Sequence, residues 1–281
     1  MLCDSSDIQN IEPIKIGLTN KSFKFDCKGK SYVLRIPGVG TDSFLSRQCE
    51  AESEAVAASL GLDATVIYID PATGWKLSEF IEDADYIDPY DAEGDQAVAM
   101  QMLKKLHEQK LHGCWDFDFV VCAEKYISDI ENDLGLAFPY KDIHAQMREL
   151  SALLDKEGFE RVLCHNDTWY WNYLKDKDGT IQLIDWEYAG NNYPVCDVAD
   201  YTLSLQFTDQ QYLDLVQLYE GRLLSEKEIR FCYGQLALCC WHWSVWAIYK
   251  DATGANVEDR EIWFGKANRY LAKTQAMYGI V

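Results

Sequence analysis

A short polar motif followed by a β-hairpin constrains the fold of this chain more than any other feature. The motif is H-N-D at 165–167, and Asn172 follows its aspartate by five residues. The turn-forming run K-D-K-D-G at 175–179 then precedes the strand-like residues I-Q-L-I at 181–184. Such a run between extended residues predicts a tight hairpin. We therefore expect the chain to fold back so that Asp185, directly after the strand, faces Asn172.

The residue types in this segment are those that a phosphoryl-transfer site uses. In such sites an aspartate accepts the proton of the substrate hydroxyl or orients it, while an asparagine and a second aspartate bind the metal at the nucleotide phosphates. Each residue alone has a simpler explanation, such as a cap, a turn residue or a surface acid. Because all three occur at this spacing, we predict Asp167, Asn172 and Asp185 as catalytic, with Asn172 and Asp185 as Mg²⁺ ligands.

Composition narrows the class of partner. The chain has 281 residues, which fits one large domain or two lobes, and 48% of them are hydrophobic, as in a globular protein. The formal net charge is −20. Such a surface repels nucleic acid and anionic membranes, so neither is expected as a partner. It suits a small cationic substrate, although acidity also simply keeps a protein soluble.

The ends and the cysteines give an expectation about location. The first residues, M-L-C-D-S-S-D, have neither the basic nor the apolar region of a signal peptide. The ten cysteines include no C-x-x-C pair and no zinc-like spacing. The longest apolar stretch, 236–249, is too short for a bilayer and contains His242. We therefore expect reduced thiols, no membrane insertion and a cytoplasmic location.

The order of elements predicts two lobes and an α+β fold. Residues 11–81 contain two hairpins, at 21–36 and 65–81, around one helix at 46–60. An acidic loop at 82–95 is the expected boundary. We predict a small β-rich N-terminal lobe, residues 1–81, and a large mainly α-helical C-terminal lobe, residues 82–281. The helices expected in the second lobe are 94–110, 119–133, 141–157, 208–220, 226–250 and 257–277.

The first lobe offers candidates for nucleotide binding. Thr19 and Asn20, in a G-L-T-N loop before the first strand, can present amides and a hydroxyl to phosphates. Arg35 ends the return strand, where a bilobal kinase carries its phosphate-contacting cation. We expect Glu50 of the following helix to hold Arg35, with Glu54 as the second choice. The alternatives are that the G-L-T-N segment is an ordinary turn and that Arg35 is simply exposed to solvent.

The last extended segment of this lobe is a candidate adenine site. The backbone of Glu79, Phe80 and Ile81 can pair with an adenine edge while apolar neighbours enclose the ring. A plain connecting strand explains the same residues equally well.

Together these residues resemble the choline/ethanolamine kinase family. The resemblance rests on 165–172 and on I-D-W-E-Y at 184–188, followed by Asn192 and Asp197, and it extends over most of the chain. It is close to the bacterial choline kinases within the wider aminoglycoside-phosphotransferase group. It implies a protein-kinase-like bilobal fold and ATP-dependent phosphorylation of choline. By motif it implies that Asp167 is the catalytic base and that Arg35 contacts ATP. It also suggests that His107 is structural.

Aromatic residues suggest how choline is held. A quaternary ammonium has no donor hydrogens, so ring faces with a nearby carboxylate bind it best. Trp243 and Trp246 stand three residues apart in a helical segment, and the resemblance places them at choline-cage positions, although such a stripe is otherwise typical of a core. The further candidates for this site are Tyr188, Trp263 and Phe264. Ser204 stands where animal relatives carry an acid, so Glu187, Asp200 and Asp209 remain candidates for the carboxylate.

Two alternatives stay open from the sequence. One is a phosphotransferase for ethanolamine or another small hydroxylated amine such as an aminoglycoside, although these primary ammonium groups favour oxygen acceptors over ring faces. The other is an inactive kinase fold that serves as a binding module. The complete set of Asp167, Asn172, Asp185 and Arg35 argues against the second.

Overall fold

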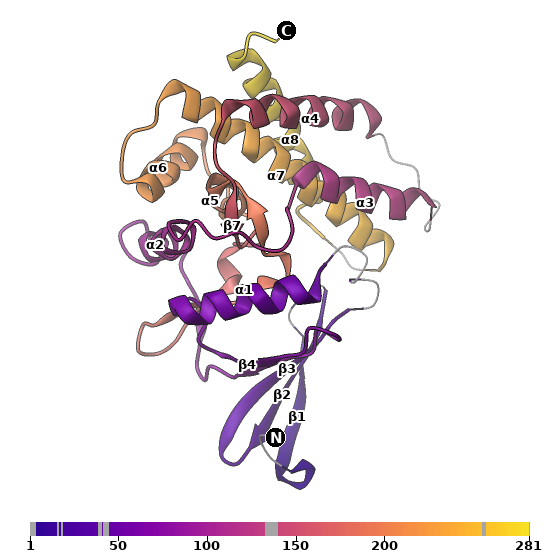
Figure 1. Cartoon of the computed structure of the whole chain (residues 1–281), viewed down its shortest axis with the longest axis vertical. Helices are drawn as coiled ribbons and strands as arrows, with labels where there is room; N and C mark the ends of the chain where they lie inside the picture. The colour runs from indigo at the N-terminus through magenta and orange to yellow at the C-terminus, as the bar shows by residue number, and fades with distance from the viewer. Residues whose placement is uncertain are drawn as a thin grey trace. The chain divides into compact units, whose positions relative to one another are not determined.

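The computed structural model describes residues 4–15, 17, 19–38, 41, 45–132, 140–254 and 257–280. The chain forms two compact units (Figure 1). The first comprises Met1–Gln96 together with Tyr170–Ala189, and the second comprises Ala97–Trp169 together with Gly190–Val281. The lobes expected at 1–81 and 82–281 stay a prediction. The grouping of the units shows in addition that the hairpin after Asn172 packs with the N-terminal residues.

A five-stranded antiparallel sheet forms most of the first unit. Its order is β1-β2-β3-β5-β4, so β1 and β4 are the edges. The expected hairpin at 21–36 is present, and its turn places Lys28 and Gly29 at φ 51° and 78°, as a tight hairpin requires. The bounds are β1 Ile8–Ile14, β2 Lys21–Cys27, β3 Lys30–Ile36, β4 Val66–Ile69 and β5 Lys76–Glu79.

The helix expected at 46–60 is α1, Arg47–Leu60. It begins where Ser46 Oγ accepts a hydrogen bond from the amide of Cys49, and it ends at Gly61 in the left-handed conformation, φ 67°. Both caps follow from the residue types. The buried side of α1 carries Glu50 and Glu54, and the helix packs against residues 186–188.

The hairpin after Asn172 also forms as expected. β8, Tyr173–Lys175, pairs with β9, Ile181–Leu183, and a turn closed by the amide of Gly179 joins them. A third short strand, β6, Asp85–Tyr86, pairs with β8. Residues 85–86 therefore form a strand within the segment 82–95, where we expected only a loop.

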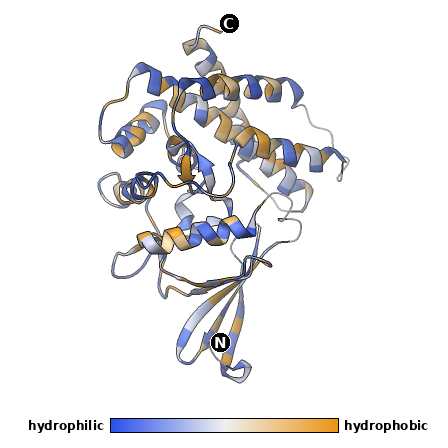
Figure 2. Ribbon diagram, viewed as in Figure 1, coloured by the Kyte–Doolittle hydropathy of each residue, from blue (hydrophilic) through white to orange (hydrophobic). Residues whose placement is uncertain are grey.

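Helices make up most of the second unit, and α7 is at its centre. Residues 231–247 of α7 are all buried, and the helix packs against α3, α4, α5 and α8. Figure 2 colours much of α7 as hydrophobic. The observed bounds are α2 Asp95–His107, α3 Phe119–Asn132, α4 Lys141–Leu154, α5 Pro194–Tyr201, α6 Asp209–Glu220, α7 Glu226–Ala252 and α8 Arg260–Met277, with the paired strands β7 Val162–Cys164 and β10 Gly190–Asn192.

Six of these helices agree with the predicted ranges to within a few residues. The helix α5 was not predicted. Among the described residues, no helix is long and apolar enough to cross a membrane. Seven described cysteines are free and buried, whereas Cys49 and Cys114 are disulfide-bonded, so the expectation of reduced thiols is wrong for these two.

Candidate functional site

The first unit brings together the two residues predicted as metal ligands. Asn172 ends a 3-10 turn and is almost buried, and its carbonyl oxygen accepts a hydrogen bond from the amide of Ile184 at 2.8 Å. Asp185, the next residue, lies in the left-handed region at φ 69°, which aspartate tolerates better than most residues. The hairpin thus holds both backbones side by side. An amide oxygen and a carboxylate are hard donors, which suit Mg²⁺.

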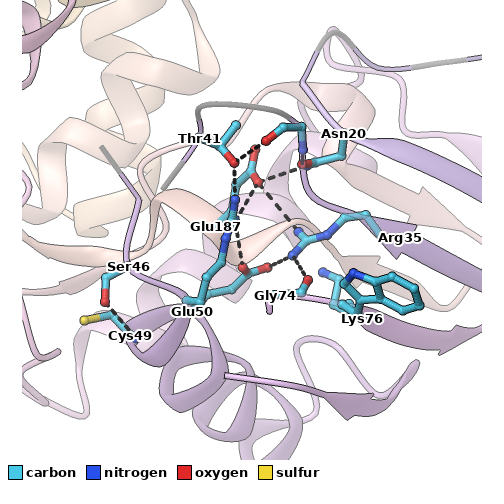
Figure 3. Close-up of polar contacts among 12 residues, drawn as sticks. Asn20, Arg35, Thr41, Ser46, Cys49, Glu50, Gly74, Lys76 and Glu187 are labelled. Atoms are coloured by element: carbon cyan, nitrogen blue, oxygen red, sulfur yellow. Dashed lines mark hydrogen bonds and ion pairs between the residues drawn. The ribbon is translucent and has the colours of Figure 1, made fainter. Parts of the chain in front are cut away.

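Arg35 lies in the middle of a polar network in the same unit (Figure 3). Its guanidinium donates to Glu50, as expected, and to Asp185 Oδ1 at 2.9 Å. The side chain is almost fully buried. Burial alone would lower the pKa of Arg35, but the carboxylates around it raise the pKa above its usual value. Arg35 therefore stays charged beside the residue predicted to bind metal.

Arg47 is a second buried cation of this network, and we did not predict it. It donates to Thr41 and, at 3.3 Å, to Glu50 Oε2. Its Nη1 also lies 3.6 Å from Glu187 Oε2. An arginine at the first position of a helix carries no sequence signal that separates it from a solvated one.

Glu187 belongs to this network as well. Its Oε2 accepts a hydrogen bond from Asn20 Nδ2 at 2.9 Å and lies 3.8 Å from Arg35 Nη1. Burial, with the nearby Asp185, raises the pKa of Glu187. Asn20 also accepts a hydrogen bond from the amide of Gly38, where a Cβ would meet the carbonyl oxygen of Thr19 at 2.0 Å. Asn20 therefore links the segment that contains Glu187 to the one that contains Gly38, and the backbone of Thr19 lies directly beside Gly38.

Glu54, the second choice as partner of Arg35, has a different partner. Its Oε1 accepts a hydrogen bond from Lys76 Nζ at 2.6 Å, and both side chains are buried. Burial raises the pKa of Glu54 to about 7 against the effect of Lys76.

The candidate adenine segment lies at the end of β5. The amides of Glu79 and Phe80 already donate to Thr65 and Ser31 of neighbouring chain segments, at 2.9 and 3.0 Å. Lys24 Nζ lies 3.9 Å from the centre of the Phe80 ring. The amides of Glu79 and Phe80 are therefore engaged within the protein and do not face a base in this arrangement.

The second unit carries the segment that contains Asp167. Two backbone amides, those of His165 and Asn166, donate to the two oxygens of Asp197, at 2.9 and 2.8 Å. His107 Nε2 lies 3.0 Å from the same carboxylate. Burial would raise the pKa of Asp197, but these hydrogen bonds and His107 lower it. His107, expected to be structural, thus helps to anchor the loop through Asp197.

Asp167 itself is half-buried between fully buried neighbours. Asn166, at φ 64°, is fixed by a hydrogen bond from Asn192 at 2.9 Å, and Thr168 is fixed by Asp200, which accepts from its amide. Left-handed residues of this kind cluster at functional sites. The loop therefore presents Asp167 from a rigid backbone.

Four tryptophans gather in the second unit. Trp169, which we did not predict, lies 5.4 Å from Trp243, 6.5 Å from Trp246 and 5.2 Å from Trp263, measured between ring centres. Trp243 and Trp246 are 5.2 Å apart in an edge-on arrangement. We call these residues, 169, 243, 246 and 263, the tryptophan cluster. Trp169 lies inside the polar motif, where no periodic pattern distinguishes it.

The remaining aromatic candidates are Phe264 in the second unit and Tyr188 in the first. Phe264 packs against Trp241, with ring centres 6.2 Å apart. Tyr188 is buried in the first unit, on the turn after Asp185. Within the second unit, the structure brings Trp243, Trp246 and Trp263 together around Trp169.

Comparisons with known proteins show the family and the fold of the chain. A family model described as choline/ethanolamine kinase matches residues 11–233. Protein LicA of Haemophilus influenzae is 27% identical over 266 residues, which cover 86% of this chain and 74% of that protein. The structure of choline kinase LicA from Streptococcus pneumoniae has a TM-score of 0.81 at 26% identity and covers 95% of this chain and 94% of that one. A structure of LicA in complex with AMP has a TM-score of 0.79 at 25% identity, covering 96% and 92%. These likenesses confirm the fold class expected from the sequence.

Proposed function

The chain belongs to the choline/ethanolamine kinase family, and from this premise we propose that it transfers the γ-phosphoryl group of ATP to the hydroxyl of choline. The products are phosphocholine and ADP. Membership confirms the family resemblance and a phosphotransferase that acts on an alcohol group. Use of ATP suits the cytoplasmic location that the sequence suggests.

The observation that carries choline as the acceptor is the tryptophan cluster. The ring of Trp169 lies within 6.5 Å of the rings of Trp243, Trp246 and Trp263, and the rings of Trp243 and Trp246 are 5.2 Å apart. Ring faces attract a methylated ammonium and contact its methyl groups, whereas a primary ammonium needs oxygen acceptors. We infer that at least Trp243 and Trp246 enclose the trimethylammonium group.

Asp167 is the proposed base. As the new oxygen–phosphorus bond forms, its carboxylate accepts the proton of the choline hydroxyl, and the bond from phosphorus to the leaving oxygen of ADP breaks. The anchoring of the loop through Asp197 supports this role, because a base works only when it is held within reach of its proton.

In this proposal the first unit binds the phosphoryl donor, ATP. Arg35, held by Glu50, contacts the phosphates, and residues 79–81 remain the candidate adenine segment, with Thr19 and Asn20 near the phosphates. Asn172 and Asp185 are the proposed ligands of Mg²⁺, which neutralises charge on the phosphates when bound. Glu187, first considered as a partner of the substrate cation, has its charge balanced by Arg35 and Arg47.

One assay of ADP release tests this function. Choline, dimethylethanolamine, ethanolamine and kanamycin are compared at equal ATP and Mg²⁺, with Asp167→Asn as the blank. We expect choline to give the highest kcat/KM, with dimethylethanolamine intermediate. Preference for ethanolamine would favour the second candidate of this family, and turnover of kanamycin alone would overturn the assignment.

A variant of the cluster separates binding from packing. Trp246→Ala should raise KM for choline several-fold to about thirtyfold and change KM for ATP little, because each aromatic wall contributes roughly 0.5–2 kcal/mol. A folded variant with unchanged KM for choline would place the cation elsewhere.

A further inference from the structure

Asp200 is a buried carboxyl group whose charge has no cationic partner. It lies on α5 and is fully buried. Among the described residues, the groups that donate hydrogen bonds to it are those of Thr168, Trp169 and Cys239, which are neutral. A buried carboxylate without a cation is costly. Burial accordingly raises the pKa of Asp200 to about 8.

Two indoles of the tryptophan cluster lie beside Asp200. Asp200 Oδ1 accepts a hydrogen bond from Trp169 Nε1 at 3.3 Å. The buried indole N–H of Trp243 lies near the same carboxyl group and lowers its pKa, although it does not complete a hydrogen bond. A carboxylate at the N–H group of an indole pushes electron density into the ring, because hydrogen-bonded groups polarise one another. The face of a ring that is more electron-rich attracts a cation more strongly. The indole N–H groups of Trp246 and Trp263 are buried without such an acceptor.

We propose that Asp200 supplies the negative charge for the substrate cation by polarising Trp169 and Trp243, and that it makes the site prefer a cation to a neutral molecule of the same shape. This inference rests on the proposed function. Asp200 is then a positioning residue that acts through two indoles.

The other candidate carboxylates are already balanced. Asp209 is on the surface and pairs with Arg269 and Lys273. Glu187 lies between Arg35 and Arg47 in the first unit. Asp200 is the candidate that gains a counter-charge only when a cation arrives.

The same geometry couples binding to a proton. A carboxyl that is neutral in the free protein loses its proton to solvent when a cation settles on the neighbouring rings, since the cation favours the charged form. The titratable groups that face Asp200 among the described residues are Asp197 on its own helix and Cys239 and Cys240 on α7. Burial raises the pKa of Cys240 to about 12. The pKa of Asp197 is lowered and that of Cys239 is raised well above its usual value, so none of the three titrates near pH 8.

The test compares choline with its neutral isostere, 3,3-dimethylbutan-1-ol, as acceptors. In Asp200→Asn we expect KM for choline to rise roughly three- to thirtyfold, with a much smaller change for the isostere and for kcat. Asp214→Asn, the same substitution at an exposed site of α6, is the control and should leave both KM values as in the wild type. An equal effect of Asp200→Asn on both acceptors would mean that Asp200 only supports packing and would overturn the proposal.

A second measurement needs no variant. In the wild type, the ratio of KM for choline to KM for the isostere should fall several-fold between pH 6.5 and 8.5. Effects of pH on Asp167 or on ATP cancel in this ratio. A constant ratio would refute the proposal even if Asp200→Asn does not fold. Failure of the proposed function itself looks different, since the wild type would then not phosphorylate choline at all.

Discussion

Replacing His242 with phenylalanine should make the protein less sensitive to acid. His242 lies on α7, is fully buried, and is surrounded by Phe117, Phe119, Tyr126 and Trp243, with ring centres 5.0 to 5.8 Å away. Burial lowers the pKa of His242 from 6.5 to about 3. The ring is therefore neutral in the folded protein at neutral and mildly acidic pH.

The magnitude follows from linkage. The unfolded chain binds a proton at this histidine below about pH 6.5, and the folded chain does not bind it until about pH 3. The stabilisation is thus complete above pH 6.5 and is lost as the pH falls toward 3. Between pH 7 and pH 5 the loss from this one group is about 2 kcal/mol, since one pKa unit corresponds to about 1.36 kcal/mol.

Urea unfolding followed by tryptophan fluorescence measures this loss, because Trp243 is adjacent to the substitution. The free energy of unfolding is determined at pH 7 and pH 5 for the wild type and for His242→Phe. Any packing cost of the larger ring is present at both pH values and cancels in the difference. His112→Gln, at an exposed site, is the control and should behave like the wild type. If the pH-dependent losses of wild type and His242→Phe agree within about 0.5 kcal/mol, the reasoning is wrong.

Three further predictions concern charged and catalytic groups. Asp167→Asn should lower kcat by a factor of roughly 10²–10⁴. ATP binding, measured by calorimetry, and folding, measured by thermal unfolding, should stay close to the wild type. A variant that retains more than about a third of the wild-type activity would refute the role of Asp167 as the base. Asp185→Ala should abolish turnover and weaken the binding of Mg·ATP. Asn172→Ala should raise the Mg²⁺ concentration needed for half the maximal rate. If the magnesium dependence is unchanged in both variants, neither residue is a ligand. Lys76→Met should lower the free energy of unfolding in urea by about 3–5 kcal/mol, because Glu54 is left buried without its cation. Adding Glu54→Leu to this variant should recover most of the loss. A Lys76→Met variant as stable as the wild type would contradict the pairing.

Local patterns predicted the elements that have clear end signals. The helix at 46–60 has its cap residues, Ser46 and Gly61, in the sequence, and the hairpin at 21–36 has its turn. By contrast, α5 spans only eight residues, which are too few positions to establish a helical period in the sequence. The strand β1 contains Pro13, which argues against a strand except at an edge, and an edge is where it lies.

The candidate site was predictable where its chemistry is local in sequence. Asn172 and Asp185 are related by one hairpin, so their neighbourhood follows from the turn. The choice of Glu50 over Glu54 as the partner of Arg35 was correct. Both glutamates lie on the buried side of α1, but Glu54 pairs with Lys76 of the sheet. Trp169 and Arg47 were missed, since only the tertiary fold shows what surrounds them.

The continuous burial of α7 has a consequence for the energetics of substrate binding. Its amides can exchange hydrogen only when the packing around residues 231–247 opens, so they should be among the slowest in hydrogen exchange. Trp243 and Trp246 lie at the end of this stretch, with their rings confined by neighbours. A ligand that binds to rings already immobilised loses little affinity to ordering them. The acceptor site proposed here is therefore preorganised by the core itself.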